Sequence, residues 1–143
     1  MDRSTARTAF ALIAMLMATL AYADTLAPTL SPDRLIERQL TKNPTLVVLD
    51  VRSAAEYQAG HVPGAINVPH DQIEERLESL APLRDKDVVV YCHSGRRAGL
   101  ALDALTKHGF TRLEHLGGDM EGWTDAHRPI ETSPADASAP PPR

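Results

Sequence analysis

Short apolar runs alternate with polar and amphipathic segments over most of the chain. Residues 46–50, 65–68, 88–91 and 112–116 form short, largely apolar runs, and turn-forming or polar residues separate them. Short runs that are apolar at successive positions are typical of strands covered on both faces. We therefore predict four strands at these positions.

Segments with helical spacing lie between the predicted strands. Ser31-Pro32 is a typical helix start, with serine as the N-cap and proline at the first helical position. Asp71 can cap a later helix, and the helix from residue 96 offers Leu100, Leu102 and Leu105 for burial. The expected helices are 33–41, 53–58, 71–80, 96–108 and 119–126.

The order of these elements predicts an α/β fold in which a small parallel β-sheet is flanked by α-helices. A length of 143 residues suits one domain, which we place at residues 24–128. Residues 129–143 are rich in proline, alanine and serine, so we expect a disordered tail there.

The N-terminal segment has the layout of a targeting sequence. Arg3 and Arg7 precede an uncharged apolar stretch at 9–20, and Ala21-Tyr22-Ala23 fits the small-x-small cleavage pattern. This layout predicts a secretory signal peptide over residues 1–23, and hence a periplasmic or secreted protein. The apolar stretch is shorter than the about 20 residues of a spanning helix, so we expect no stable membrane insertion after cleavage. The alternatives are an uncleaved anchor and a fortuitous apolar leader.

Composition and charge narrow the classes of partner. The net charge is −4, aromatic residues make up 4% of the chain, and no basic stripe is interleaved with aromatic residues. Nucleic-acid binding is therefore not expected. We also expect a monomer that needs no metal ion and no organic cofactor.

The only cysteine opens the run Cys92-His93-Ser94-Gly95-Arg96-Arg97, between the strand predicted at 88–91 and the helix predicted from residue 96. It cannot form a disulfide within the chain, although an exported protein meets oxidising conditions. Backbone N–H groups and the helix dipole at such a turn favour a thiolate and attract anions. The run predicts a nucleophile and an anionic substrate, with an inert buried cysteine as the alternative.

Four segments resemble, in the same order, the motifs of single-domain rhodaneses, which are sulfurtransferases of the thiosulfate type. They lie within residues 31–128. The resemblance implies an active-site loop at the carboxyl end of the central strand, where ligands bind in open α/β sheets. The segments are Asp50-Val51-Arg52; Glu56-Tyr57 with 60–69; Tyr91 to Ala98; and Gly117-Gly118 with Gly122-Trp123.

The resemblance implies an enzyme that transfers sulfur through a persulfide on Cys92. The Cys92 thiolate would take the outer sulfur of a small anionic donor such as thiosulfate and pass it to cyanide or a thiol, in a double displacement. Arg97 would contact the anionic end of the donor or hold the shape of the loop. The residues expected to surround the sulfur and the substrate are His93, Ser94, Gly95, Arg96, Arg97 and Ala98.

Other residues that match the family are expected to support the loop. Asp50 and Arg52 would form an ion pair near it, and Arg52 could alternatively reach the substrate. Glu56 and His61 would form a hydrogen-bonded brace under the turn at Pro63-Gly64.

Two other classes share parts of the pattern. Cysteine phosphatases and arsenate reductases also use an anion-binding loop, but their arginine stands six positions after the cysteine. In this chain that position is Ala98, and Arg97 comes one residue earlier. A non-catalytic rhodanese-like binding module is the other alternative, although such modules often lack the cysteine. A thiol-disulfide oxidoreductase is disfavoured because the chain has no Cys-x-x-Cys motif.

Overall fold

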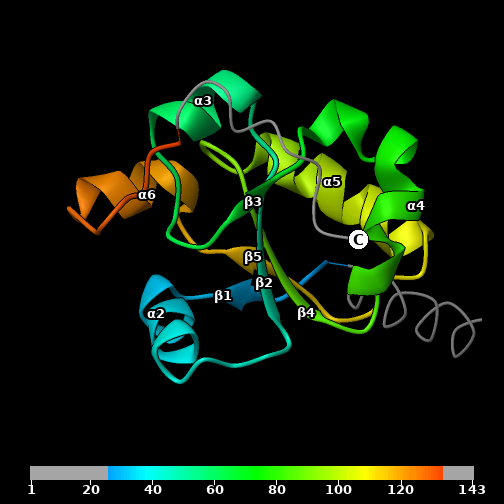
Figure 1. Ribbon diagram of the computed structural model, residues 1–143, viewed down its shortest axis with the longest axis horizontal. Coiled ribbons are helices and arrows are strands. Elements are labelled where there is room, and N and C mark those ends of the chain that lie inside the picture. Colours follow the sequence, from blue (N-terminus) through cyan, green and yellow to red (C-terminus); the bar gives the residue numbers. More distant parts are fainter. Residues whose placement is uncertain (1–25, 134–143) are drawn as a thin grey trace, which may run out of the picture.

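The central sheet contains five strands: β1 (Thr29–Leu30), β2 (Leu46–Asp50), β3 (Ile66–Asn67), β4 (Asp87–Tyr91) and β5 (Leu113–Leu116). The structure, a computed structural model, describes residues 26–133. All strands run parallel in the order β1-β5-β4-β2-β3, so β4 is the central strand (Figure 1). The predicted α/β fold with a parallel sheet is therefore confirmed.

β1 is a strand that the apolar pattern does not predict. It contains two residues, too few to show any periodicity, and it pairs with β5 through Thr29 beside His115 and Leu30 beside Leu116. Its assignment thus depends on a partner that lies far away in the sequence. The four predicted strands all occur, with β3 reduced to Ile66–Asn67.

The described helices are α2 (Pro32–Leu40), α3 (Ala54–Ala59), α4 (Leu77–Leu80), α5 (Arg96–Lys107) and α6 (Asp119–Asp125), with 3-10 turns η1 (His70–Gln72), η2 (Glu74–Arg76) and η3 (Ala81–Leu83). The prediction of one helix over 71–80 is wrong. The Arg76 backbone, at φ −105° and ψ 8°, leaves the helical region before α4 begins. Tighter turns over this stretch bring Ile73 and Leu80 into the same core.

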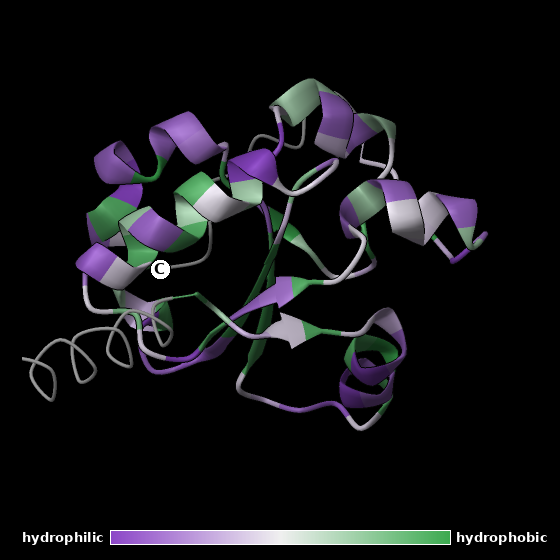
Figure 2. Cartoon of the chain, turned by 180° about the vertical axis from the view of Figure 1, so that it is seen from behind, coloured by the Kyte–Doolittle hydropathy of each residue, from purple (hydrophilic) through white to green (hydrophobic). Residues whose placement is uncertain are grey.

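Helices cover both faces of the sheet, with α4 and α5 on one face and α2 and α6 on the other (Figure 1). Successive residues of β4 alternate between the two cores. Val88 and Val90 pack into the core with α5, whereas Val89 and Tyr91 pack into the core with α2 and α6. The central strands are hydrophobic along their length in Figure 2, as burial on both faces requires.

The buried side of α5 is narrower than the leucine pattern predicts. Leu102 and Leu105 are buried together with Ala98 and Ala101, but Leu100 is 54% exposed. Residues two positions apart lie on nearly opposite sides of an α-helix, so Leu100 and Leu102 cannot both face the sheet. The prediction that Leu100 is buried is therefore wrong.

Residues 129–133, here called the C-terminal strap, lie against the domain. The Trp123 indole donates to the Pro129 carbonyl at 2.8 Å. His61 and Glu131 exchange two backbone hydrogen bonds of 2.9 Å, and the Glu131 carboxylate accepts the Gly64 N–H group at 2.9 Å. These contacts extend the folded domain into the segment that the composition assigns to a tail.

The predicted signal peptide at 1–23 and the remaining tail residues, 134–143, lie outside the described residues. Within residues 26–133, no helix has the length and apolar character needed to cross a bilayer.

Truncation tests the contribution of the C-terminal strap. A chain that ends at Ser133 keeps every contact described for the strap, so its free energy of unfolding should match that of the full chain. A chain that ends at Arg128 leaves the Trp123 indole and the Gly64 amide without protein partners. We expect it to lose about 1–3 kcal/mol in urea denaturation. Equal stability of the two truncated chains would contradict this assignment.

Candidate active site

Cys92 lies directly after β4, at the carboxyl edge of the sheet. Its sulfur accepts a hydrogen bond from the Gly95 backbone N–H group at 3.0 Å. Gly95 has a φ of 109°, a left-handed conformation that glycine adopts without strain. A Cβ atom there would lie 3.2 Å from an Asp119 carboxylate oxygen and 3.4 Å from the His115 ring. The loop can therefore fold back over its own cysteine because residue 95 is glycine.

The N-terminus of α5 adds to the positive potential around the sulfur. The backbone N–H groups of Arg96, Arg97 and Ala98 belong to the first helical turn, which offers them no acceptor within the helix. Intrahelical bonding begins with the bond of Gly99 to the Gly95 carbonyl at 3.0 Å. Among residues 26–133, Gly95 supplies the backbone N–H group bonded to Sγ, whereas the sequence predicts a cradle of amides along 93–98. The other backbone N–H groups of residues 93–98 are close to the cysteine in the sequence but form no hydrogen bond to its sulfur.

Cys92 is only 2% exposed and belongs to the apolar core that packs against α5. The next residues, His93 and Ser94, are exposed, as is Arg96. Ala98, in contrast, is buried in the core between α5 and the sheet.

Arg97 forms an ion pair with Glu56, which links α5 to α3. Its two terminal nitrogens donate to the two Glu56 carboxylate oxygens at 2.8 and 2.9 Å. Glu56 also accepts the Ser53 N–H group at 3.1 Å and completes a capping box at the start of α3. The hydrogen bond from Arg97 lowers the pKa of Glu56 to about 2. Of the two roles expected for Arg97, the observed contacts are those of a residue that holds the loop.

Glu56 and His61, expected to brace one turn together, have different partners in the structure. His61 Nδ1 lies 2.7 Å from the Tyr57 carbonyl, and the two rings stack with centroids 3.7 Å apart. The turn at Pro63-Gly64 is held instead by Gln39 Nε2, which donates to the Pro63 carbonyl at 2.7 Å, and by the strap residue Glu131. The predicted brace is therefore wrong. The contacts that hold this turn in its place come from α2 and the C-terminal strap, which are distant from it in sequence.

Asp50 and Arg52 form the predicted ion pair, at 2.6 Å between Arg52 and Asp50 Oδ2. Both are buried, and Arg52 also donates to the Gly60 carbonyl at 2.7 Å. The Tyr91 hydroxyl donates to Asp50 Oδ2 at 2.7 Å and accepts the Val62 N–H group at 3.0 Å. Burial raises the pKa of the Tyr91 phenol, so it remains a hydrogen-bond donor. These contacts engage Arg52 with Asp50, the Gly60 carbonyl and the ring of Tyr91, the residue before the cysteine.

Asp119 and His115 are neighbours of Cys92 that sequence reasoning missed. Asp119 Oδ1 accepts the Cys92 backbone N–H group at 2.9 Å, and both carboxylate oxygens lie 3.0 Å from His115 Nε2. Asp119 has a φ of 52°, a conformation that aspartate tolerates better than most residues. The signal that could have identified it is an aspartate directly after Gly117-Gly118, at the start of a helix.

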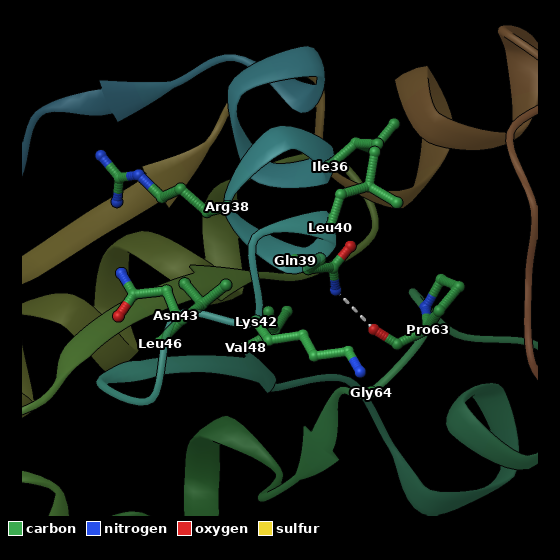
Figure 3. A pocket seen from close by; sticks show the side chains of 10 residues that line it. All are labelled: Ile36, Arg38, Gln39, Leu40, Lys42, Asn43, Leu46, Val48, Pro63 and Gly64. Atoms are coloured by element: carbon green, nitrogen blue, oxygen red, sulfur yellow. Dashed lines mark hydrogen bonds between the residues drawn. The ribbon is translucent and has the colours of Figure 1, made fainter.

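A groove of about 480 Å³ lies elsewhere, between α2 and β2, with Pro63 and Gly64 on its far side (Figure 3). It contains no sulfur nucleophile, and its Arg38 side chain is paired with Glu114. We therefore assign the reactive centre to the Cys92 loop. Residues 26–133 also contain no group of three or more His, Cys, Asp or Glu side chains arranged to hold a metal ion.

Comparisons with known proteins show which family this chain belongs to. A family model described as a rhodanese-like domain matches residues 31–126. The thiosulfate sulfurtransferase PspE of Escherichia coli (strain K12) is 41% identical over 70 residues, which cover 49% of this chain and 67% of that protein. A tRNA uridine(34) hydroxylase of Pectobacterium carotovorum subsp. carotovorum (strain PC1) is 36% identical over 85 residues, 57% of this chain and 24% of that protein.

A similar fold occurs in the crystal structure of a thiosulfate sulfurtransferase from Pseudomonas aeruginosa. The TM-score is 0.68 at 28% sequence identity, and the match covers 80% of this chain and 22% of that chain. This chain thus spans a minor part of two of these three proteins, and the activities that their names state differ. The family model spans most of the described domain, from Ser31 at the start of α2 to Ala126 at the end of α6.

The ion pair between Arg97 and Glu56 predicts a specific pH dependence of stability. Glu56 has a folded-state pKa of about 2 against an ordinary value of 4.5, so its stabilising contribution is present above pH 4.5 and disappears as the pH falls through 2. The two side chains are 28% and 36% exposed, so solvent screening limits the contribution to about 1 kcal/mol. Glu56→Gln should lower the thermal midpoint at pH 7 but not near pH 2.

Glu37→Gln is the matched control for this measurement. Glu37 pairs with Arg34 on α2, and both side chains are at least 60% exposed. That substitution should leave the midpoint unchanged across the same pH range. If Glu56→Gln lowered the thermal midpoint as much at pH 2 as at pH 7, the loss of stability could not be assigned to the ion pair.

Proposed function

Because the chain belongs to the rhodanese-like domain family, we propose that it moves a sulfane sulfur from a small anionic donor, such as thiosulfate, to a thiol or cyanide. The observation that carries the proposal is the position of Cys92. Its sulfur follows the central strand, accepts the Gly95 amide and precedes the N-terminus of α5. This is the environment in which a thiolate and an added anionic sulfur are both stabilised.

The first half-reaction forms a persulfide. The Cys92 thiolate attacks the outer sulfur of thiosulfate, a new S–S bond forms, and the bond between the two donor sulfurs breaks. Its electron pair leaves with sulfite. The enzyme then carries Cys92–S–S⁻, whose terminal sulfur bears the negative charge, so the charge on the two sides of the step balances. The Gly95 amide is bonded to the Cys92 sulfur and the N-terminus of α5 follows it in the chain, so both favour negative charge beside the loop.

The second half-reaction returns the enzyme to its starting state. The acceptor, cyanide or a thiolate, attacks the terminal sulfur of the persulfide, and the S–S bond to Cys92 breaks. The products are thiocyanate or a small persulfide, together with the Cys92 thiolate. Because the first product leaves before the acceptor enters, the kinetics should be of the ping-pong type.

The burial of Cys92 favours a small donor. Because only 2% of Cys92 is exposed, the sulfur that a donor transfers must be its terminal atom and must be carried by a small group. Arg96 is exposed beside the loop and can attract the anionic end, whereas the charge of Arg97 is balanced by Glu56. Ala98 stands at the position where a phosphatase loop places arginine, and its side chain is buried in the core. These features favour sulfur transfer over phosphate-ester hydrolysis.

Export and a monomeric state are further parts of the proposal. Support for export comes from the targeting layout of residues 1–23. The physiological donor and acceptor would then be those available outside the cytoplasm.

Replacement of the nucleophile tests the function. Wild-type protein incubated with thiosulfate should release sulfite and gain the mass of one sulfur atom on Cys92, and cyanide should remove that mass as thiocyanate. Cys92→Ser should lose both properties, with sulfite release down by at least about a thousandfold, because a serine hydroxyl is not ionised at neutral pH. Its far-ultraviolet circular dichroism should match that of the wild type.

Two controls separate the alternatives. Ser79→Ala, an exposed substitution on α4, should keep full activity. The second control supplies p-nitrophenyl phosphate in place of thiosulfate, which should not turn over. A folded wild-type protein that neither releases sulfite nor gains sulfur mass would support a binding module instead.

A further inference from the structure

We propose that Asp119 and His115 form a positioning pair that holds the Cys92 backbone and sets how sulfur transfer depends on pH. The inference rests on the proposed function and adds two residues to its site. Neither residue touches the sulfur through a hydrogen bond. Both act through the peptide group of Cys92 and through the charge they place beneath the loop.

The first argument is the way α6 holds the cysteine. Asp119 Oδ1 accepts the Cys92 N–H group at 2.9 Å, and the Met120 N–H group donates to the Cys92 carbonyl at 3.0 Å. The Glu121 N–H group donates to the His93 carbonyl, also at 3.0 Å. β4 pairs with β5 as far as Val90, which lies beside His115. Beyond this point, hydrogen bonds to α6 hold the chain that leaves β4. The Asp119 carboxylate thus fixes the peptide that carries the nucleophile.

The second argument is electrostatic. Asp119 is 4% exposed, and the carboxylate lies against Gly95 and the Cys92 amide. A bare negative charge there would oppose both a thiolate and an anionic donor. His115 Nε2, 3.0 Å from both oxygens, balances that charge when the imidazole is protonated. The hydrogen bond to Asp119 raises the pKa of His115 above its ordinary 6.5, which favours the balanced form at neutral pH.

Other ionisable groups on the elements around the pair are either engaged elsewhere or exposed. Four of them have their own partners: Asp87 with Arg112, Tyr91 with Asp50, Glu114 with Arg38, and Arg97 with Glu56. β1 contributes only Thr29 and Leu30. Water and salt screen the charges of the ionisable side chains that are exposed, so His115 is the group whose charge compensates the Asp119 carboxylate. The exposed side chains are His93, Arg96, Glu121 and Asp125.

The left-handed backbone at residue 119 supplies well-matched variants. Asparagine and glycine both adopt a φ of 52°, so Asp119→Asn and Asp119→Gly avoid backbone strain. The asparagine carbonyl still accepts the Cys92 N–H group but carries no charge, whereas glycine removes both acceptor and charge. His115→Gln keeps a neutral donor near the Nε2 position and cannot be protonated.

The experiment measures kcat/KM for sulfite release from thiosulfate between pH 5.5 and 9.5, with Cys92 alkylation by iodoacetamide measured over the same range. For the wild type, kcat/KM should fall at alkaline pH as His115 loses its proton. Asp119→Asn should keep the wild-type value at low pH and lose the alkaline fall. His115→Gln should be lower by about tenfold already at pH 6, because the Asp119 charge is then never balanced.

Asp119→Gly separates the hydrogen bond from the charge. We expect kcat to fall by about tenfold at every pH, since the acceptor for the Cys92 N–H group is gone, and Asp119→Asn to restore it. Equal kcat for the glycine and asparagine variants would overturn the positioning role. An alkaline fall that survives in Asp119→Asn would overturn the electrostatic role.

The two proposals fail in different ways. If the wild type releases no sulfite at any pH, the proposed function fails, whatever the variants do. If the wild type releases sulfite but all three variants share its pH profiles of turnover and alkylation, the inference about Asp119 and His115 fails while the function stands.

Discussion

The hydrogen bond from the Gly95 amide to the Cys92 sulfur is the contact on which the site depends. It exists because the chain leaves β4, turns through a left-handed glycine at residue 95 and enters α5 at Arg96. The two cores fix both sides of that turn, since β4 and α5 are each held by buried apolar side chains. Within residues 26–133, the sulfur beside the N-terminus of α5 has a hydrogen bond to this backbone amide and to no charged side chain.

Two ion pairs hold the surroundings of this turn, and they differ in kind. Arg52 and Asp50 are buried, and their remaining hydrogen-bonding capacity is met by Tyr91 and the Gly60 carbonyl. Such a pair fixes geometry, because removal of either partner would leave a buried charge. Arg97 and Glu56 are partly exposed and contribute less free energy, but they join the first turn of α5 to the cap of α3.

Local chemistry explains which sequence predictions succeeded. Apolar runs located the four main strands, and Ser31-Pro32 and Ser53 marked the starts of two helices correctly. The predicted pair of Asp50 and Arg52 lies two residues apart, within reach of a single strand end. Failures occurred where local signals compete, as at 71–80, where acidic residues and helical spacing predict a helix that the packing of Ile73 and Leu80 replaces with tighter turns.

By itself the sequence determined the parallel α/β architecture and the position of the lone cysteine at a strand-to-helix turn, because apolar periodicity and the order of neighbouring residues are local properties. Only the tertiary structure decided the partners of those residues: Glu56 for Arg97, Asp119 for the Cys92 amide, Glu131 for the turn at Pro63-Gly64. Each of these contacts joins segments 27 to 67 residues apart. Spacing along the chain carries no information about such pairs, since the packing of helices and the C-terminal strap on the sheet brings them together.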